Sequence, residues 1–133
     1  MGEKFEIPKD LLYSKEHEWV KVDGDIATQG ITDIAQHILT DIVFVELPKV
    51  GAKVEQSKSF MVIESVKSVS DVNARVSGEI VEINEELTDN PAIINEDPYK
   101  NGWLVKIKMK DESKVENMLS SEDYGKHCEE AKH

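Results

Sequence analysis

Lys67 is the residue whose surroundings most clearly indicate chemistry. It lies in the segment ESVKSVSD (residues 64–71), where small and β-branched residues flank a single lysine. Strand-like runs precede and follow it, at residues 59–65 and 68–73, so the chain must reverse direction at Val66-Lys67. Most lysines on hairpin turns only add solubility. A lone ε-amine on a short turn is also what an amide-forming enzyme can reach, and we predict that Lys67 is exposed and modified.

No other side chains form a recognisable catalytic or metal-binding pattern. The sequence has no glycine-rich phosphate loop, no HExxH, no paired CxxC and no GxSxG. His127 and Cys128 are adjacent, but no second pair stands at metal-site spacing, and His17 and His37 are isolated. We therefore predict no catalytic residue and no metal in this chain.

Composition and charge limit the partners of the protein. The 133 residues allow one compact domain, and the net charge of −11 disfavours nucleic acid and anionic membranes. Partner enzymes should therefore present basic docking surfaces. A single cysteine permits no internal disulfide, and the chain lacks both a signal-peptide core and an apolar run of about 18 residues. We expect a cytoplasmic protein that does not enter a membrane.

The first half of the sequence predicts strands around a short helix. Asp23-Gly24 should turn a hairpin between strand-like runs. Thr32 can cap a helix that reaches Leu39. Residues 41–47 are apolar on both faces, as in a buried strand, and Pro48 ends them.

The second half continues the β pattern and ends in a helix. Residues 79–84 predict a strand, with Gly78 as a bulge or bend. Asn90-Pro91 suits a helix entry, and residues 103–110 alternate as a half-buried strand does. A capping box at residues 113–116 predicts that a C-terminal helix begins there and includes the apolar residues that follow.

These elements predict a mainly β protein, either a small barrel or a two-sheet sandwich, with short peripheral helices. We divide it into an N-terminal arm (1–12), a β domain that presents Lys67 (13–110), and a C-terminal helical segment packed on that domain (111–133).

Five segments in order resemble the glycine cleavage H-protein family. They are YSKEHEWV (13–20), GITDIAQHILTDIVFVELP (30–48), ESVKSVSDVN (64–73), VSGEIVEIN (76–84) and GWLVKIK (102–108). The resemblance extends from about Tyr13 to Cys128. It implies a lipoyl-domain-like barrel-sandwich hybrid, with lipoate in amide linkage to Lys67, and a carrier without catalysis of its own.

The resemblance also implies a set of partners. A pyridoxal-phosphate glycine decarboxylase (P protein) loads an aminomethyl group onto the arm. A folate-dependent aminomethyltransferase (T protein) removes it with release of ammonia, and dihydrolipoyl dehydrogenase (L protein), a flavoenzyme, reoxidises the dithiol. A separate lipoate-attaching enzyme installs the arm, and we expect the carrier to be a monomer.

The family holds the loaded arm in a cleft, whose contacts map here onto Glu18, Ile31 and Asp71, with Glu16 contributing. Carboxylates suit this role because the carried amine is cationic near neutral pH. Exclusion of water would slow loss of the carried group. Glu64, three residues before the lysine, is expected to help the lipoate-attaching enzyme recognise the turn.

Two departures from the family pattern affect the expected loop shape. Arg75 stands where the family commonly has Pro, and Gln56-Ser57 replaces a turn usually richer in Gly.

Three alternatives remain open from the sequence. An H-protein-like lipoyl carrier could serve sulfur oxidation or a lipoate relay, which neighbouring genes would distinguish. A biotin carrier shares the fold but typically has Met on both sides of its lysine, unlike Val66 and Ser68. An autonomous enzyme would show turnover by the unmodified chain.

Overall fold

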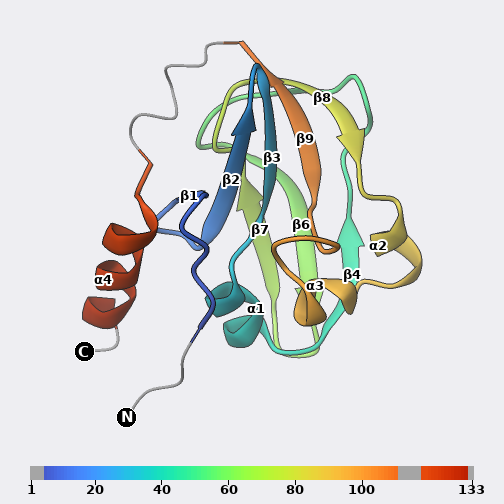
Figure 1. The fold of residues 1–133 in the computed structure, drawn as a ribbon. Helices are drawn as coiled ribbons and strands as arrows, with labels where there is room; N and C mark the ends of the chain where they lie inside the picture. The colour runs from blue at the N-terminus through green and yellow to red at the C-terminus, as the bar shows by residue number, and fades with distance from the viewer. Residues whose placement is uncertain (1–4, 111–117, 132–133) are drawn as a thin grey trace.

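The structure is a computed structural model that describes residues 5–131 apart from 111–117. It contains two antiparallel β-sheets with short helices around them (Figure 1). The larger sheet has the strand order β1-β2-β3-β9-β8-β5, and the smaller has the order β4-β6-β7. The strands are β1 Leu12–Tyr13, β2 Glu18–Asp23, β3 Ile26–Ile31, β4 Ile42–Glu46, β5 Lys53–Val54, β6 Ser59–Ser65, β7 Val69–Asn73, β8 Gly78–Ile83 and β9 Val105–Met109. The helices are α1 Asp33–Leu39, α2 Glu86–Asp89, α3 Ile93–Glu96 and α4 Ser121–Ala131.

Local sequence signals explain the first elements. Gly24 adopts a φ of 64° in the turn between β2 and β3, a conformation that costs glycine little. Thr32 caps α1 as predicted, because its hydroxyl accepts a hydrogen bond from the Ala35 N–H at 3.2 Å. The turn keeps β2 and β3 adjacent in the larger sheet, and α1 then leads the chain to β4 in the smaller sheet.

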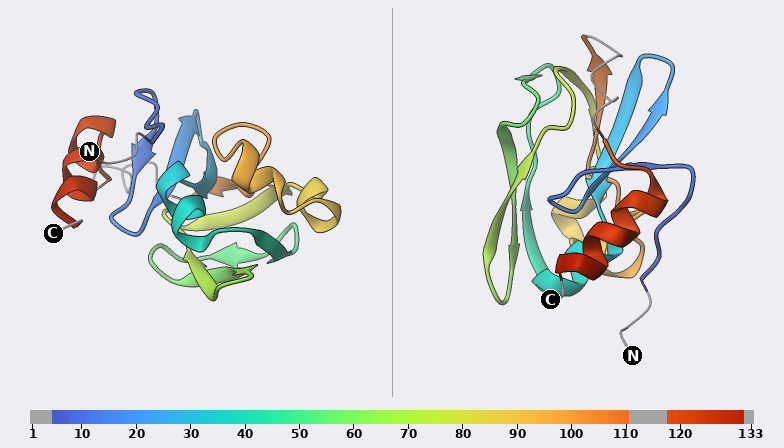
Figure 2. Two further views of the ribbon diagram at one scale, coloured as in Figure 1. Left: turned by 90° about the horizontal axis from the view of Figure 1, so that it is seen from below. Right: turned by 90° about the vertical axis from the view of Figure 1, so that its left-hand side faces the viewer.

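The main core lies between the two sheets, which form two layers in Figure 2. Ala27 and Ile107 face it from the larger sheet, and Ile63 and Val72 face it from the smaller sheet. Each of these four side chains is at most 2% exposed. Burial of so many aliphatic side chains holds the two layers in a fixed relation.

A second apolar cluster joins the two ends of the chain to the domain. Tyr13 from β1 stacks on Tyr124 from α4, with ring centroids 4.7 Å apart, and both side chains are fully buried. Figure 2 shows α4 lying on the β1 side of the molecule. Within the described residues, no helix is long and apolar enough to cross a membrane.

The C-terminal helix begins later than the sequence indicated. Leu119 was expected inside a helix that starts near residue 113, but it forms an isolated antiparallel bridge with Tyr13. Its N–H and C=O bond the backbone of Tyr13 at 2.7 and 2.8 Å, and these bonds keep Leu119 extended. The helix α4 begins at Ser121, and the predicted capping box at residues 113–116 lies outside the described residues.

Two other expectations were wrong in detail. The strand β4 is not buried on both faces. Its register shifts between Ile42 and Phe44, and the consecutive Val43 and Phe44 are 53% and 48% exposed. The bulge in β8 lies between Ile80 and Glu82 rather than at Gly78. Gly78 instead permits close approach of a strand, since a Cβ there would lie 2.0 Å from the Lys108 carbonyl oxygen.

Candidate functional site

Lys67 lies on the turn that joins β6 to β7, and its side chain is exposed. The Ser65 hydroxyl oxygen accepts hydrogen bonds from the backbone N–H groups of Lys67 and Ser68, at 3.2 and 3.0 Å. The Ser65 N–H also donates to the Ser68 carbonyl at 2.8 Å. One serine therefore satisfies the backbone of the turn and leaves the lysine side chain free to extend into solvent.

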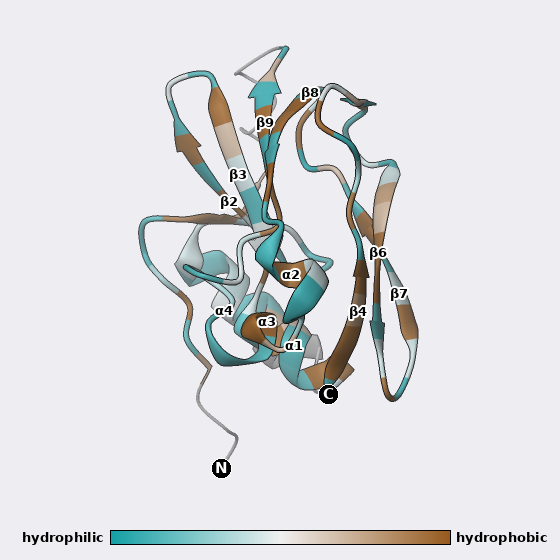
Figure 3. Ribbon diagram, turned by 90° about the vertical axis from the view of Figure 1, so that its right-hand side faces the viewer, coloured by the Kyte–Doolittle hydropathy of each residue, from teal (hydrophilic) through white to brown (hydrophobic). Residues whose placement is uncertain are grey.

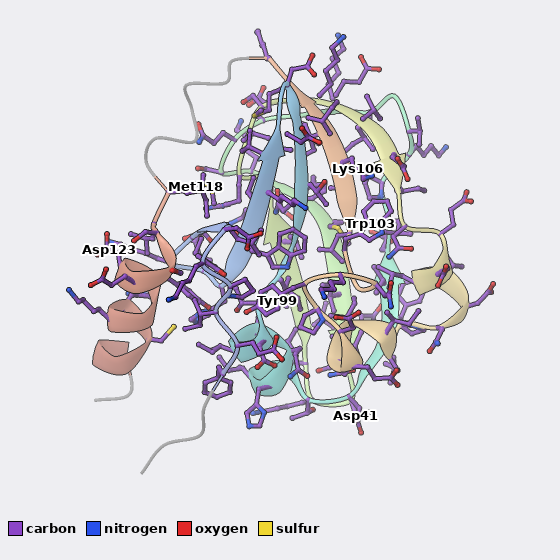
Figure 4. All side chains as sticks on the ribbon, in the orientation of Figure 1. Asp41, Tyr99, Trp103, Lys106, Met118 and Asp123 are labelled. Carbon is purple, nitrogen blue, oxygen red and sulfur yellow. The ribbon has the colours of Figure 1, made fainter. Side chains whose placement is uncertain are left out.

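The turn is also held from outside the hairpin. The Val66 N–H donates to the Asp41 carbonyl at 3.0 Å, just before β4 begins. Figure 4 places Asp41 at the end of the molecule where α1 and the β6–β7 turn lie. Lys67 is therefore presented by a turn with both local and long-range support, which limits its movement.

Apolar side chains surround the lysine on the outer face of the smaller sheet. The register places Phe44 opposite Glu64 and Glu64 opposite Val69, so these three side chains form one row across the sheet. Val66 and Val69 are 69% and 65% exposed. Figure 3 shows the apolar character of β4 beside the β6–β7 hairpin. The half-buried Glu64 thus stands between two exposed apolar residues.

The residues predicted for the arm cleft line one cavity of about 110 Å³. Glu16 and Glu18 approach it from the start of β2, Ile31 from the end of β3, and Asp71 from β7. The remaining walls come from α1 and the inner faces of β6 and β7: Ala35, Ile38, Leu39, Ile63, Ser70 and Val72, with His17 beside the glutamates. The fold therefore gathers residues from the start of β2 and from β3, α1, β6 and β7.

Glu18 is the most buried of these carboxylates, at 3% exposure. It accepts hydrogen bonds from the Ser14 hydroxyl at 3.0 Å and the Asn73 N–H at 2.9 Å. The Arg75 guanidinium lies 2.9 Å from the same carboxylate. Burial raises the pKa of Glu18, while Arg75, the Asn73 N–H and Ser14 oppose that rise. The carboxylate is thus held in place by three donors.

Asp71 occupies a different environment from Glu18. It is exposed, and it contributes to the lining of the cavity from β7, where alternation places its side chain on the opposite face of the strand from Ser70 and the buried Val72. Among the described residues it forms no ion pair. Asp71 therefore keeps its charge open to an incoming cation.

The sequence did not indicate the role of Arg75. Its guanidinium also contacts Glu16 at 2.9 Å, and its side chain is only 12% exposed. A signal was available, because a glutamate beside the buried Trp19 needs a cation, and few basic residues lie in the core segments. Nothing local connects positions 18 and 75, so the sequence could not select the partner.

A hydrogen-bonded network behind the cavity was also missed. The Tyr124 hydroxyl lies 2.7 Å from His17 Nδ1 and 2.7 Å from the Thr32 hydroxyl. His17 has a φ of 70°, which is uncommon for a residue with a side chain. Burial lowers the pKa of His17, with His127 adding to the effect. The network connects α4 to the segment that supplies Glu16 and Glu18.

No group of three or more His, Cys, Asp or Glu residues is arranged to bind a metal in the part of the chain that the structure describes. An exposed lysine on a supported turn, beside a small acidic cavity in a two-sheet β domain, instead defines a carrier that presents a covalently attached group.

Comparison with known proteins identifies the family. The chain matches the family described as Glycine cleavage H-protein over residues 11–131. It is 55% identical over 124 residues to the glycine cleavage system H protein of Halothermothrix orenii, covering 93% of this chain and 97% of that protein. It is 54% identical over 127 residues to the mitochondrial glycine cleavage system H protein 2 of Arabidopsis thaliana, covering 94% and 81%.

A solved structure agrees with this match. The crystal structure of a glycine cleavage system H protein from Mycobacterium marinum superposes with a TM-score of 0.86 at 39% identity, covering 92% of this chain and 99% of that one. The chain belongs to the glycine cleavage H-protein family, and its fold is the hybrid barrel-sandwich of that family.

Family membership confirms several predictions. H proteins are non-catalytic lipoyl carriers of the glycine cleavage system and carry lipoate on a lysine, and this chain is such a carrier. Membership of that system implies the P, T and L proteins as partners.

Proposed function

We propose that Lys67 is the lysine that carries the lipoyl group. The supporting observation is the turn itself, where an exposed lysine side chain extends from a backbone held by Ser65 and by the Asp41 carbonyl. The attached group supplies a disulfide that can be reduced, loaded with aminomethyl and reoxidised. The protein supplies position, since its turn aims the arm while the lysine side chain leaves the arm free to reach a partner's active site.

The cavity lined by Glu16, Glu18, Ile31 and Asp71 is proposed to hold the end of the loaded arm. Apolar walls from Ile31 and α1 would exclude water, and the carboxylates would attract the cationic amine. Glu18 would act from a fixed position because three donors hold it. Asp71, which is exposed, would meet the amine as it enters.

Glu64 is proposed to contribute to recognition by the lipoate-attaching enzyme. That enzyme must bring its active site to an ε-amine only about 6 Å from the Lys67 Cα, so it must cover the neighbouring surface. The row of Phe44, Glu64 and Val69 offers two exposed apolar contacts around one carboxylate at that place. Such a surface can be recognised by an apolar pocket that contains a basic residue.

We also propose a monomeric cytoplasmic carrier whose partners bind it through basic surfaces. The net charge of −11 supports this proposal, because opposite charges steer association. Dissociation constants for the P, T and L proteins should then rise with ionic strength. Equal affinities in low and high salt would contradict the electrostatic part of the proposal.

The attachment site is tested by Lys67→Arg, with Lys58→Arg as the control. Lys58 directly precedes β6, and its side chain is 75% exposed, so it is a comparable lysine on the same hairpin. Arginine cannot displace an activated lipoyl group, because its guanidinium stays protonated and is a poor nucleophile.

Intact mass after incubation with lipoate, ATP and a lipoate-attaching ligase gives the result. We expect one added lipoyl group on the wild type and on Lys58→Arg, and none on Lys67→Arg. A lipoyl adduct on Lys67→Arg would show that the attachment site is elsewhere.

A further inference from the structure

Arg75 connects the two glutamates of the proposed arm cleft. Its Nε lies 2.9 Å from a Glu18 carboxylate oxygen, and a terminal guanidinium nitrogen lies 2.9 Å from Glu16. Without this cation, the carboxylates of Glu16 and Glu18 would lie close together with no opposite charge between them, and Glu18 is almost fully buried.

Two glutamines fix the backbone of Arg75. The Arg75 N–H donates to the Gln29 side-chain oxygen at 3.1 Å, and the Gln56 side-chain amide donates to the Arg75 carbonyl at 3.0 Å. Gln29 is fully buried and also donates to the Asn73 carbonyl at 2.8 Å. The guanidinium therefore extends from a backbone position held on both sides.

The two departures from the family pattern contact each other here. Gln56 and Arg75 are 19 residues apart in sequence but are joined by the amide-to-carbonyl hydrogen bond. Ser57, next to Gln56, has a φ of 73°, and its N–H donates to the Ala74 carbonyl at 2.7 Å. The two loops thus form one structure that supports the guanidinium, whereas a proline at position 75 would lack both the guanidinium and the N–H used by Gln29.

The Glu18 carboxylate retains hydrogen-bonding capacity that a ligand could use. An ionised carboxylate offers about four lone-pair positions. Ser14, Arg75 and Asn73 occupy three, so one acceptor position remains on a carboxylate that lines the cavity. That position attracts an ammonium only while Glu18 is charged.

We propose that Arg75 is a positioning residue of the arm cleft, which keeps the buried Glu18 carboxylate charged and directed beside the cavity so that it can hold the amine of the loaded arm. This inference rests on the proposed arm cleft. Within the described part of the chain, the charged or titratable groups around Glu18 are Arg75, Glu16, His17 and Asp71.

The first test uses the unlipoylated chain. The pKa of the Glu18 carboxyl is measured by carbon-13 NMR in the wild type, Arg75→Gln and Arg75→Lys. Removal of a cation at hydrogen-bond distance should raise the pKa of Glu18 by at least about one unit in Arg75→Gln. Arg75→Lys keeps the charge without the two-pronged geometry, so its shift should be smaller. An unchanged Glu18 pKa in both variants would overturn the inference.

The second test follows loss of the aminomethyl group from the loaded arm between pH 6 and pH 8. The lifetime in Arg75→Gln, divided by that of the wild type at the same pH, should fall as the pH is lowered, because a larger fraction of the Glu18 carboxyl is neutral in the variant than in the wild type. Asp71→Asn is the comparison, since its lifetime ratio should not follow the titration of Glu18.

The outcomes separate the inference from the proposed function. If the wild-type arm loses its group as fast as free lipoamide loaded in the same way, the arm cleft itself is wrong. If the wild type protects the group and Arg75→Gln protects it equally across the pH range, the cleft stands and the role of Arg75 is refuted. Should Arg75→Gln fail to fold, Arg75→Lys decides. A raised Glu18 pKa with a shorter lifetime at low pH supports the inference, and an unchanged Glu18 pKa with a wild-type lifetime profile refutes it.

Discussion

Replacement of Tyr124 by phenylalanine should loosen the connection between α4 and the proposed arm cleft. Tyr124 is fully buried, and its hydroxyl lies 2.7 Å from both His17 and Thr32. Phenylalanine retains the ring stacked on Tyr13 but removes the oxygen that joins α4 to the β2 segment and to the α1 cap. The change therefore removes hydrogen bonds with little loss of packing.

The size of the effect follows from the partners left behind. Thr32 keeps its bond from the Ala35 N–H, whereas the half-buried His17 Nδ1 loses its hydrogen bond with the Tyr124 hydroxyl. One lost hydrogen bond and one incompletely satisfied buried group together cost about 2 kcal/mol. For a domain of this size that corresponds to a fall in Tm of roughly 6–10 °C.

Urea unfolding at pH 7.5 measures this loss, and hydrogen exchange of the α4 amides locates it. Tyr13→Phe is the matched control, since its hydroxyl donates to the half-exposed Pro8 carbonyl at 2.6 Å, which water can hydrate after the change. Its cost should be about 1 kcal/mol or less. The reasoning fails if Tyr124→Phe unfolds within 0.5 kcal/mol of the wild type, a margin of about one ordinary surface substitution. It also fails if α4 exchanges no faster.

Three further predictions test other parts of the molecule. Asp71→Asn should change the unfolding free energy by less than about 0.5 kcal/mol, because the side chain is exposed. It should still shorten the lifetime of the loaded arm, and an unchanged lifetime would remove Asp71 from the cleft. Burial lowers the pKa of His17 from 6.5, so the folded state binds fewer protons than the unfolded state, and stability should fall as pH drops below about 6.5. His17→Asn, which tolerates the positive φ, should flatten that slope in pH-dependent urea titrations, and parallel slopes would exclude His17 as the cause. Gly78→Ala should lower the free energy of unfolding by about 3 kcal/mol, because its Cβ would meet the Lys108 carbonyl oxygen at 2.0 Å. Gly125→Ala, whose Cβ would lie 3.7 Å from its nearest neighbour, should be neutral or stabilising. Thermal unfolding measures both variants, and equal Tm values would refute this contrast.

Short-range features were the ones that the sequence predicted well. The cap at Thr32, the hairpin at Gly24 and the turn at Lys67 all depend on bonds between residues a few positions apart. Their residue types restrict the backbone directly, through a hydroxyl that bonds a nearby N–H or a glycine that accepts a positive φ. The resemblance to H proteins added the name of the attached group, which the turn alone did not indicate.

Competition between segments decided the features that were mispredicted. The apolar residues that include Leu119 have helical spacing. In the structure, however, the backbone of Leu119 forms an antiparallel bridge with the backbone of Tyr13 instead of a helix. The apolar residues of β4 suggested burial, yet the smaller sheet has only three strands among the described residues, and nothing covers the outer side of Val43 and Phe44 there. Local propensity cannot foresee which partner lies alongside a segment.

The sequence by itself determined where the exposed turn that presents Lys67 lies, because that turn is built from adjacent residues with small side chains. Only the tertiary structure decided the charge of the cavity, since the ion pair of Glu18 with Arg75 spans 57 positions of the chain and the bond of His17 with Tyr124 spans 107. A buried charge requires a partner, but the sequence leaves many candidates, and the folding of β2, β7 and α4 against one another selects among them.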